Sequence, residues 1–330
     1  MTISAKIVAD SISPDGIRLT TILLRYPRFI HAEAKTHRVM SIGGEEYIAL
    51  TQDEGFMSDK NLSRNASSSR AIPVEKMIQA VIDDPVMPIH WGKNQKGMQA
   101  AQELSIDEQR VAIRAWLKGM EKAVETARQL SDLGLHKQIV NRVIEPWSHI
   151  TVVVTATEWN NFLHLRDHED AQPEIAELAR QCRVELELND PTLLAYGEWH
   201  LPFITQGDVE NVVTYLQKGR ITRDMPSLAE RFKVLRKVST ARCARTSYLT
   251  HDKLDPKIED DIALYDRLVG SSPLHASPTE HQATPDEKVG YDEKGMELST
   301  PTWGNPDLHG NLSGWIQFRK TLANENVTTR

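Results

Sequence analysis

The chain has 330 residues, 40% of them hydrophobic and 26% charged, which is typical of a globular protein with a sizeable core. Its formal net charge is −7, so general attraction to a nucleic acid polymer or an anionic membrane is not expected, and phosphate binding would need local arginine clusters. No stretch of the sequence reaches the roughly 18 apolar residues of a membrane span, and the first residues lack the apolar core of a signal peptide. We therefore expect a cytoplasmic protein that binds small anions.

Residues 3–9 and 17–24 are β-branched and apolar, and a Ser-Pro-Asp-Gly turn separates them. This pattern predicts a β-hairpin. A short helix between Pro27 and Arg38 is expected to follow it.

The densest group of basic and hydroxyl residues is divided into two runs, residues 36–41 and 63–73. Arginine's planar fork pairs with two phosphate oxygens at once, and a Ser-Ser-Ser turn adds hydroxyls and backbone N–H groups. Apolar spacing after Pro73 predicts a helix whose positive N-terminal end faces the same place. These runs indicate a phosphate site, although basic residues beside serines also occur in ordinary solvated loops. The segment 42–63, which is rich in acidic residues, is either a lid or an inserted loop without a function.

Farther along the chain the local signals are mostly helical. Residues 85–99 predict a surface loop, and Ser105 with Glu108 forms a capping box that opens a long amphipathic helix ending near Gly134. The run 150–154 predicts a strand. One helix is expected to begin near residue 157 and another near residue 173. Further helices are expected between residue 180 and about Lys237, and around residues 258–268.

Two cysteines show no sign of a special function, and a Trp-His pair has two possible interpretations. Cys182 and Cys243 have neither Cys-x-x-Cys spacing nor suitable histidine neighbours, so we expect buried thiols, with no disulfide framework and no metal site. Trp199 and His200 either contact a ligand or pack on the core as part of an aromatic-proline turn.

Joined across the acidic insertion, the two basic runs resemble the signature of the flavin-dependent thymidylate synthases, the ThyX family. That signature runs Arg-His-Arg, seven residues, Ser, and ends in Arg. His37 and Arg38 match its His-Arg, Ser68 matches its Ser, and Arg70 matches its last Arg. Asn65 falls at the position of a flavin-contacting Asn.

Three positions depart from the family pattern. Thr36 stands where the family has its first Arg, and Ala66 stands where it has a Glu. Glu33 stands where the family has a Gln that contacts nucleotide. These departures leave the details of base recognition open.

Two further blocks resemble the same family. Arg142–Pro146 matches an Arg-x-x-x-Pro pattern whose Arg reaches the dUMP phosphate of a neighbouring subunit. Asn161, Leu165 and Arg166 match an Asn-x-x-x-Leu-Arg pattern that offers an amide to the flavin and a guanidinium to the base. Without the resemblance, Arg166 would be read as a surface arginine paired with a neighbouring acidic residue.

Two more blocks lie downstream. Residues 244–248 resemble the family's Ala-Arg-Val-Ser-Tyr, and residues 274–281 resemble its His-x-Thr/Ser-Pro-Phe-Glu-His. The flavin-site candidates in these blocks are Ser247, His275, Ser277 and Glu280.

The order of the blocks differs from the family pattern. The last two blocks precede the signature in the family but follow it here, so the chain resembles a divergent, circularly permuted member of the kind carried by phages. Residues 312–320 resemble the segment that normally precedes His-Arg. Gln317 and Arg319 would then replace the Gln and Arg that are missing at Glu33 and Thr36.

The resemblance implies an α/β (α+β) fold with a central, mostly antiparallel sheet flanked by helices. We expect one catalytic domain over residues 1–330, with 42–63 as an inserted loop and 83–135 as a loop and long helix foreign to the family. It further implies a homotetramer with active sites at subunit interfaces, without nucleic acid or membrane partners. The location would be the cytoplasm, that of the host if the protein is phage-encoded.

The implied activity is reductive methylation of dUMP to dTMP, with methylenetetrahydrofolate and NADPH as co-substrates and FAD as cofactor. Alternatives are a flavin- and folate-dependent dUMP hydroxymethylase, or a nucleotide- and flavin-binding protein without turnover. The implied catalytic residues are Arg166 and Ser68, and no metal is expected. The implied dUMP ligands are Glu33, Ser67, Ser68, Ser69, Arg70, Arg142, Arg166, Gln317 and Arg319. The implied FAD ligands are His37, Arg38, Asn65, Asn161, Leu165, Ser247, His275, Ser277 and Glu280.

Overall fold

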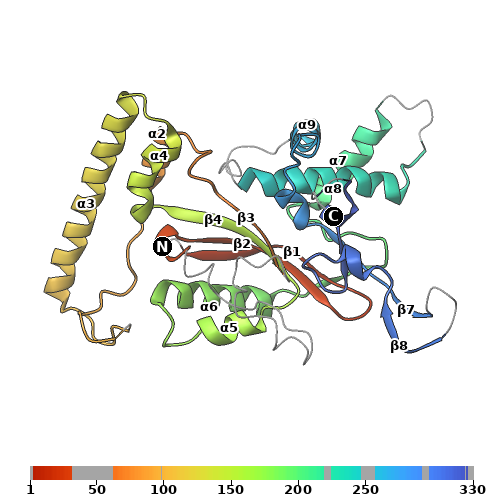
Figure 1. The fold of residues 1–330 in the computed structure, drawn as a ribbon, viewed down its shortest axis with the longest axis horizontal. Helices are drawn as coiled ribbons and strands as arrows, with labels where there is room; N and C mark the ends of the chain where they lie inside the picture. Colours follow the sequence, from red (N-terminus) through yellow and green to blue (C-terminus); the bar gives the residue numbers. More distant parts are fainter. Residues whose placement is uncertain are drawn as a thin grey trace, which may run out of the picture.

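A five-stranded sheet forms the centre of the molecule (Figure 1). The computed structural model describes residues 3–31, 62–97, 99–218, 224–246, 257–291, 297–323 and 325. The strands β1 (Ser4–Ile12), β2 (Arg18–Pro27), β3 (Leu62–Ala66), β4 (His149–Ala156) and β5 (Thr192–Leu193) lie in the order β3-β4-β2-β1-β5. Only β5 pairs in parallel, with β1, and the other pairings are antiparallel. The predicted hairpin, the strand at 150–154 and the mostly antiparallel sheet are confirmed.

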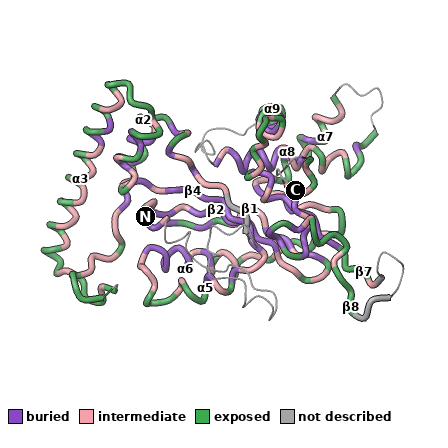
Figure 2. Tube along the Cα trace, in the orientation of Figure 1, coloured by how far each residue is buried: buried purple, intermediate pink, exposed green. Residues whose placement is uncertain are grey.

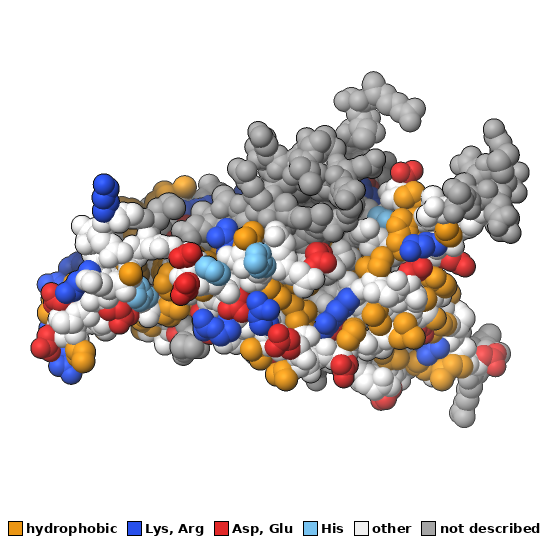
Figure 3. Space-filling model, turned by 90° about the horizontal axis from the view of Figure 1, so that it is seen from below, with side chains coloured by type: hydrophobic (Ala, Val, Ile, Leu, Met, Phe, Trp, Pro, Cys, Tyr) orange, Lys and Arg blue, Asp and Glu red, His pale blue; other side chains and the backbone are white. Residues whose placement is uncertain are grey.

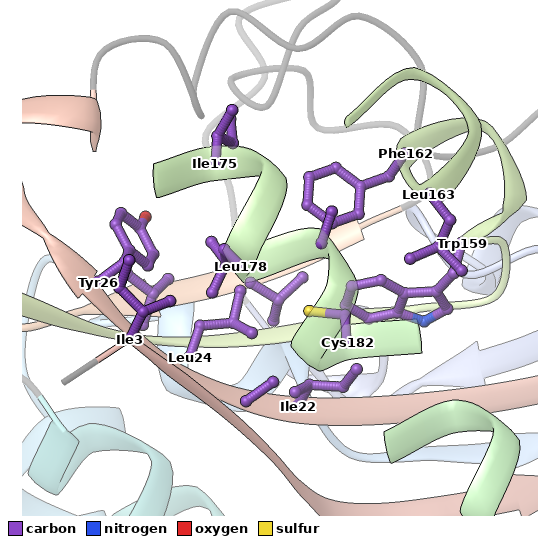
Figure 4. Packing of buried hydrophobic residues seen from close by; sticks show 14 of the residues in the cluster. Ile3, Ile22, Leu24, Tyr26, Trp159, Phe162, Leu163, Ile175, Leu178 and Cys182 are labelled. Atoms are coloured by element: carbon purple, nitrogen blue, oxygen red, sulfur yellow. The ribbon is translucent and has the colours of Figure 1, made fainter. Parts of the chain in front are cut away.

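Two helices cover one face of this sheet, α5 (Asn160–Arg166) and α6 (Pro173–Leu188). Successive side chains of a strand point to opposite faces, so alternate apolar residues of β2 and β4 fall on this side. Figure 4 shows those of β2 in one core with Trp159, Phe162, Leu178 and Cys182. Burial raises the pKa of the Cys182 thiol above its usual range, in agreement with the expected buried thiol.

The C-terminal part of the chain covers the other face. It contributes α7 (Gln206–Gln217), α8 (Leu228–Arg245), α9 (Ile258–Val269) and the 3-10 turn η5 (Ser277–Glu280). A two-stranded sheet of β6 (Ala283–Pro285) and β9 (Trp315–Gln317) lies beside them and packs through Trp315 on Leu19 of β2. The short 3-10 turn η7 (Phe318–Thr321) follows β9.

The expected end of a helix near Lys237 is wrong, because α8 continues to Arg245. The run Ser239–Ala244 is buried, and its polar groups find partners there. Ser239 Oγ donates to the carbonyl of Pro202 at 2.8 Å, and Thr240 Oγ1 donates to Gln282 at 3.1 Å. Tertiary contacts therefore extend the helix beyond its amphipathic part.

A separate helical group lies where β3 ends and β4 begins (Figure 1). It is made of α2 (Val74–Asp83), α3 (Ile106–Asp132), α4 (Lys137–Val140) and the 3-10 segment η3 (Asn141–Trp147). The helix expected after Pro73 and the Ser105 capping box are confirmed. Only Val124 and Ala127 of the predicted α3 stripe are fully buried, because α3 packs on one side against a small group of elements. Figure 2 shows that most of α3 is exposed or half-buried.

The rest of the described chain consists of short elements: η1 (Arg28–Ile30), η6 (Pro306–Leu308), and the projecting hairpin β7 (Lys288–Tyr291) and β8 (Glu297–Trp303). Figure 3 shows charges of both signs interspersed over the left half of the face seen from below, with more hydrophobic side chains toward the end that carries β7 and β8. Among the described helices, none combines the length and apolar character needed to cross a membrane. No cluster of His, Cys, Asp and Glu in the described ranges is placed to hold a metal ion.

Candidate functional site

Strand β3 carries the candidate flavin contact Asn65 toward α8. Asn65 pairs with Val153 of β4, and the next residue, Ala66, packs into the α5–α6 core. Because neighbouring side chains alternate, Asn65 faces the opposite layer, where its Nδ2 donates to the carbonyl of Cys243 at 2.7 Å. The amide thus connects the signature strand to the C-terminal end of α8.

The turn η5 packs against both β3 and α8 and brings further candidates to this place. The guanidinium Nη1 of Arg319 donates to the Glu280 carboxylate. The Nε2 of Gln317 donates to the Glu280 carbonyl at 3.0 Å and to Asn311 Oδ1 at 2.5 Å. We call Asn65, Ser277, Glu280, Gln317 and Arg319 the β3–η5 cluster. It joins residues that are more than two hundred positions apart in sequence.

Exposure separates the members of this cluster. Gln317 is buried, whereas Ser277 and the nearby His275 are exposed. Burial alone would lower the pKa of Arg319, but Glu280 and Glu325 together hold it above its usual value. Arg319 is therefore charged and held by two carboxylates within this chain.

A second group of candidates surrounds the turn that follows β3. Ser67 is anchored to β4, since its N–H donates to the Thr151 carbonyl at 2.8 Å and its Oγ accepts from the Thr151 N–H at 3.1 Å. Asn141 Nδ2 donates to the Ser69 carbonyl at 2.7 Å and to the Ile72 carbonyl at 2.9 Å. Ser67 and Ser69 are buried, Ser68 is half-buried and Arg70 is exposed. The turn is thus rigidly held, with Arg70 at its open side.

Among the described residues, cations outnumber carboxylates around this turn. Arg142 is exposed and pairs with Glu145 at 3.2 Å. Lys137 Nζ donates to the Ala71 carbonyl at 2.9 Å. Among the described residues, neither Arg70 nor Lys137 has an ion-pair partner. Residues Ser67, Ser68, Ser69, Arg70, Lys137 and Arg142 are named the serine-turn cluster below.

Sequence reasoning missed Arg28, which lies behind the serine turn. Its side chain is only 12% exposed, and its Nη1 is 3.8 Å from Glu145, the carboxylate that also pairs with Arg142. Its Nε donates to Ser148 Oγ at 3.2 Å and its Nη2 to the Ser67 carbonyl at 3.5 Å. Burial lowers the pKa of Arg28 below its usual value. The only local signal was an arginine placed directly after an apolar strand and a proline.

The α5 candidates lie elsewhere on the chain. Asn161 and Arg166 are half-buried, and Leu165 is 47% exposed. Helix α5 follows the end of β4 at Ala156, whereas the serine turn is fixed to Thr151. At about 3.3 Å per strand residue, these points are roughly 17 Å apart along β4. The two groups of candidates therefore follow from different points of β4.

Four candidates, Glu33, His37, Arg38 and Ser247, lie outside the described residues. The same is true of most of the insertion 42–63, so its interpretation as a lid stays a prediction.

Comparison with known proteins bears on the candidates of β2 through α6. Residues 18–192 match the family described as thymidylate synthase complementing protein (Thy1). Among curated proteins, none matches this sequence. Among solved structures, the chain is similar to PolB from Streptomyces cacaoi, a UMP/dUMP methylase, bound with 5-Br dUMP. The identity is 16% and the TM-score is 0.40, and the match covers 56% of this chain and 89% of that one. The same protein bound with 5-Br UMP matches at 16% identity and a TM-score of 0.39, with coverages of 56% and 88%.

The family match spans β2, the serine turn, η3, β4, α5 and α6, which is just over half of the chain. It includes Asn65, the serine-turn cluster and the α5 candidates, but it ends before η5 and β9. The chain belongs to the thymidylate synthase complementing protein family, the ThyX family.

Proposed function

We propose that this protein is a thymidylate synthase that methylates dUMP at C5, with methylenetetrahydrofolate as carbon donor, FAD as cofactor and NADPH as reductant. The observation that carries the proposal is the serine-turn cluster within the family match. A rigid turn offers hydroxyls, and in the described part of the chain the cations beside it outnumber the one carboxylate that they contact, Glu145. Such an arrangement suits the phosphate of a nucleotide.

In this proposal the serine turn binds the dUMP phosphate. Arg70 is exposed four residues before α2 begins at Val74, and the N-terminus of that helix would add favourable dipoles. Arg142 would exchange its exposed pairing with Glu145 for the phosphate, and Ser68 would act as a hydrogen-bonding ligand rather than a nucleophile. Arg166 would stabilise negative charge that develops on the uracil ring.

The donors and acceptors of the β3–η5 cluster fit a flavin. Asn65, Ser277, Glu280 and the exposed His275 offer amide, hydroxyl, carboxylate and imidazole groups, which suit the polar edge of the ring and the ribityl hydroxyls. FAD would supply the hydride that completes the methyl group. His37, Arg38, Asn161, Leu165 and Ser247 complete the set proposed to hold it.

The distance between α5 and the serine turn favours a site shared by two subunits. Since roughly 17 Å of β4 separates them in one chain, Arg166 would reach the uracil of a nucleotide held by another copy. We therefore propose a homo-oligomer, specifically a homotetramer, in which the active site is completed across an interface.

One incubation tests the proposed function. Purified protein is mixed with dUMP, methylenetetrahydrofolate and NADPH, and the product is identified by mass spectrometry while FAD is measured by its visible absorbance. We expect bound FAD and a product with the mass of dTMP. A hydroxymethylated product would instead assign the dUMP hydroxymethylase activity, and binding of dUMP without any product would assign the binding protein. A protein that takes up no FAD and leaves dUMP unbound would overturn the proposal.

Removing Arg70 should weaken dUMP binding strongly. Arg70→Ala deletes a charge-assisted contact to phosphate, and the expected loss is about 2–4 kcal/mol, or roughly 30- to 1,000-fold in Kd. The measurement is calorimetric titration with dUMP. Arg110→Ala is the matched control, because Arg110 is an exposed arginine of α3 that pairs only with Asp107 in the described structure. Equal dUMP affinities of both variants would remove Arg70 from the phosphate site.

A further inference from the structure

A pocket of about 370 Å³ lies between β1 and α8, and its lining shares no residue with either cluster described above. Its apolar wall is formed by Leu194, Leu201, Ile204, Val209, Phe232 and Leu235. Strand β1 is three strand positions from β3 in the sheet, or roughly 14 Å at about 4.8 Å per strand. The volume lies within the range of about 300–1,000 Å³ that is usual for small-molecule pockets.

The carboxylate in the lining of this β1–α8 pocket is fully used by other groups. Asp10 accepts from Arg18 Nε at 3.0 Å and Nη2 at 2.6 Å. It also accepts from Thr20 Oγ1 at 2.8 Å and Asn189 Nδ2 at 2.7 Å. Ser11, the other polar residue that β1 contributes to the lining, is hydrogen-bonded through its Oγ to His200 Nδ1 at 2.9 Å. These polar groups are satisfied without a ligand.

Arg231 is the exception in the pocket lining. Its Nε is buried and has no hydrogen-bond partner, and no described carboxylate pairs with its guanidinium. The adjacent Glu230 is turned to the start of α8, where it accepts from the Ser227 N–H at 2.8 Å and the Ser227 hydroxyl at 2.9 Å. The guanidinium of Arg231 therefore lacks a described counter-charge at the wall of a largely apolar pocket, and an anion in the pocket would supply that counter-charge.

We propose that the β1–α8 pocket binds a small organic monocarboxylate, with its carboxylate on Arg231 and its apolar body against the pocket wall. One arginine matches one negative charge, which fits a monocarboxylate better than a phosphate. The apolar wall requires an aliphatic or aryl body rather than a sugar. The pocket lining shares no residue with the sets proposed to bind the nucleotide and the flavin, and its test does not depend on them.

Calorimetric titration of the full chain with octanoate, and with octanamide as its neutral match, tests the site. We expect one octanoate per chain, and we expect Arg231→Gln to weaken octanoate binding about tenfold to a hundredfold while leaving octanamide affinity unchanged. Arg231→Lys should keep most of the octanoate affinity, because it keeps the charge. Lys233→Gln is the control, since it removes one positive charge from an exposed position of the same helix outside the pocket lining.

Three results would overturn the proposal: wild-type protein that binds no octanoate, equal octanoate affinities of Arg231→Gln and wild type, or an equal loss in Lys233→Gln. The third result would show a general charge effect. Circular dichroism of each variant shows whether it is folded, and Arg231→Lys provides the decisive comparison if Arg231→Gln does not fold.

Discussion

Replacing Asp261 by asparagine is expected to lower the free energy of unfolding by about 3–5 kcal/mol, the loss usual when one partner of a buried ion pair is removed. Asp261 of α9 is fully buried and accepts from two arginines of α8. Arg242 Nε is 3.1 Å from its Oδ2, and Arg245 donates to its Oδ1 at 3.0 and 2.8 Å. Asparagine keeps the volume of the side chain but removes the negative charge that both arginines contact.

The second carboxylate of this network explains why the loss should not be larger. Arg242 also donates to both oxygens of Asp208 in α7, at 2.7 and 2.5 Å. Burial alone would raise the pKa of Asp208, but hydrogen bonds from Arg242 and Thr205 hold it below its usual value. Asp208 therefore stays ionised at neutral pH and keeps Arg242 paired in the Asp261→Asn variant.

Urea unfolding followed by circular dichroism measures the effect. Glu259→Gln is the matched control on the same helix, because Glu259 forms an exposed pair with Lys218 at 2.8 Å. Exposed pairs contribute about 0–1 kcal/mol, so this variant should unfold almost like the wild type. Similar losses in both variants would mean that the buried network contributes no more than a surface pair.

The network also shows what the sequence could not predict. The hairpin, the helix after Pro73 and the Ser105 capping box were predicted correctly because their signals are local: a turn, a proline and two residues three positions apart. Arg242 meets Asp208 and Asp261 across 34 and 19 positions, and no spacing rule connects them. Without those partners, the helix was expected to end near Lys237 instead of at Arg245.

The candidate site was predicted in part from a resemblance to a family, and not from local signals of secondary structure. The family signature pointed to the serine turn, and the match over residues 18–192 confirms the family. Arg28 was missed because it comes beside Ser67 only when β2 and β3 both pair with β4. The contact between Glu280 and Arg319 likewise depends on how β6 pairs with β9, which the sequence does not specify. The assignments of ligand to each residue remain predictions.

His200 illustrates a question that the sequence left open and the structure answers. It is fully buried and hydrogen-bonded to Ser11 and Thr21, so it packs on the core within this chain. Thr21 Oγ1 lies 2.6 Å from Thr155 Oγ1, which lies 2.8 Å from Nδ1 of His281. The two buried histidines are therefore linked by hydrogen bonds through the side chains of Thr21 and Thr155.

These two histidines should make the protein lose stability from about pH 6.5 downward, before its carboxylates begin to titrate. Burial lowers the pKa of His200 and of His281 from 6.5 to about 3. Between these values the unfolded chain binds protons that the folded chain does not, so stability falls as the pH falls from about 6.5 toward 3. From pH 7 to pH 5 each histidine should remove about 2 kcal/mol, hence about 4 kcal/mol for the pair.

The double variant His200→Gln/His281→Asn tests this effect through urea unfolding at pH 7 and pH 5. Its free energy of unfolding at pH 7 should be below that of the wild type, but the further loss on going to pH 5 should be smaller by about 4 kcal/mol. A smaller dependence should persist, because burial also lowers the pKa of His149 to about 4. His164→Gln, at an exposed position of α5, should keep the full wild-type dependence. If the double variant loses as much stability as the wild type between the two pH values, the histidines are not the source of the acid sensitivity.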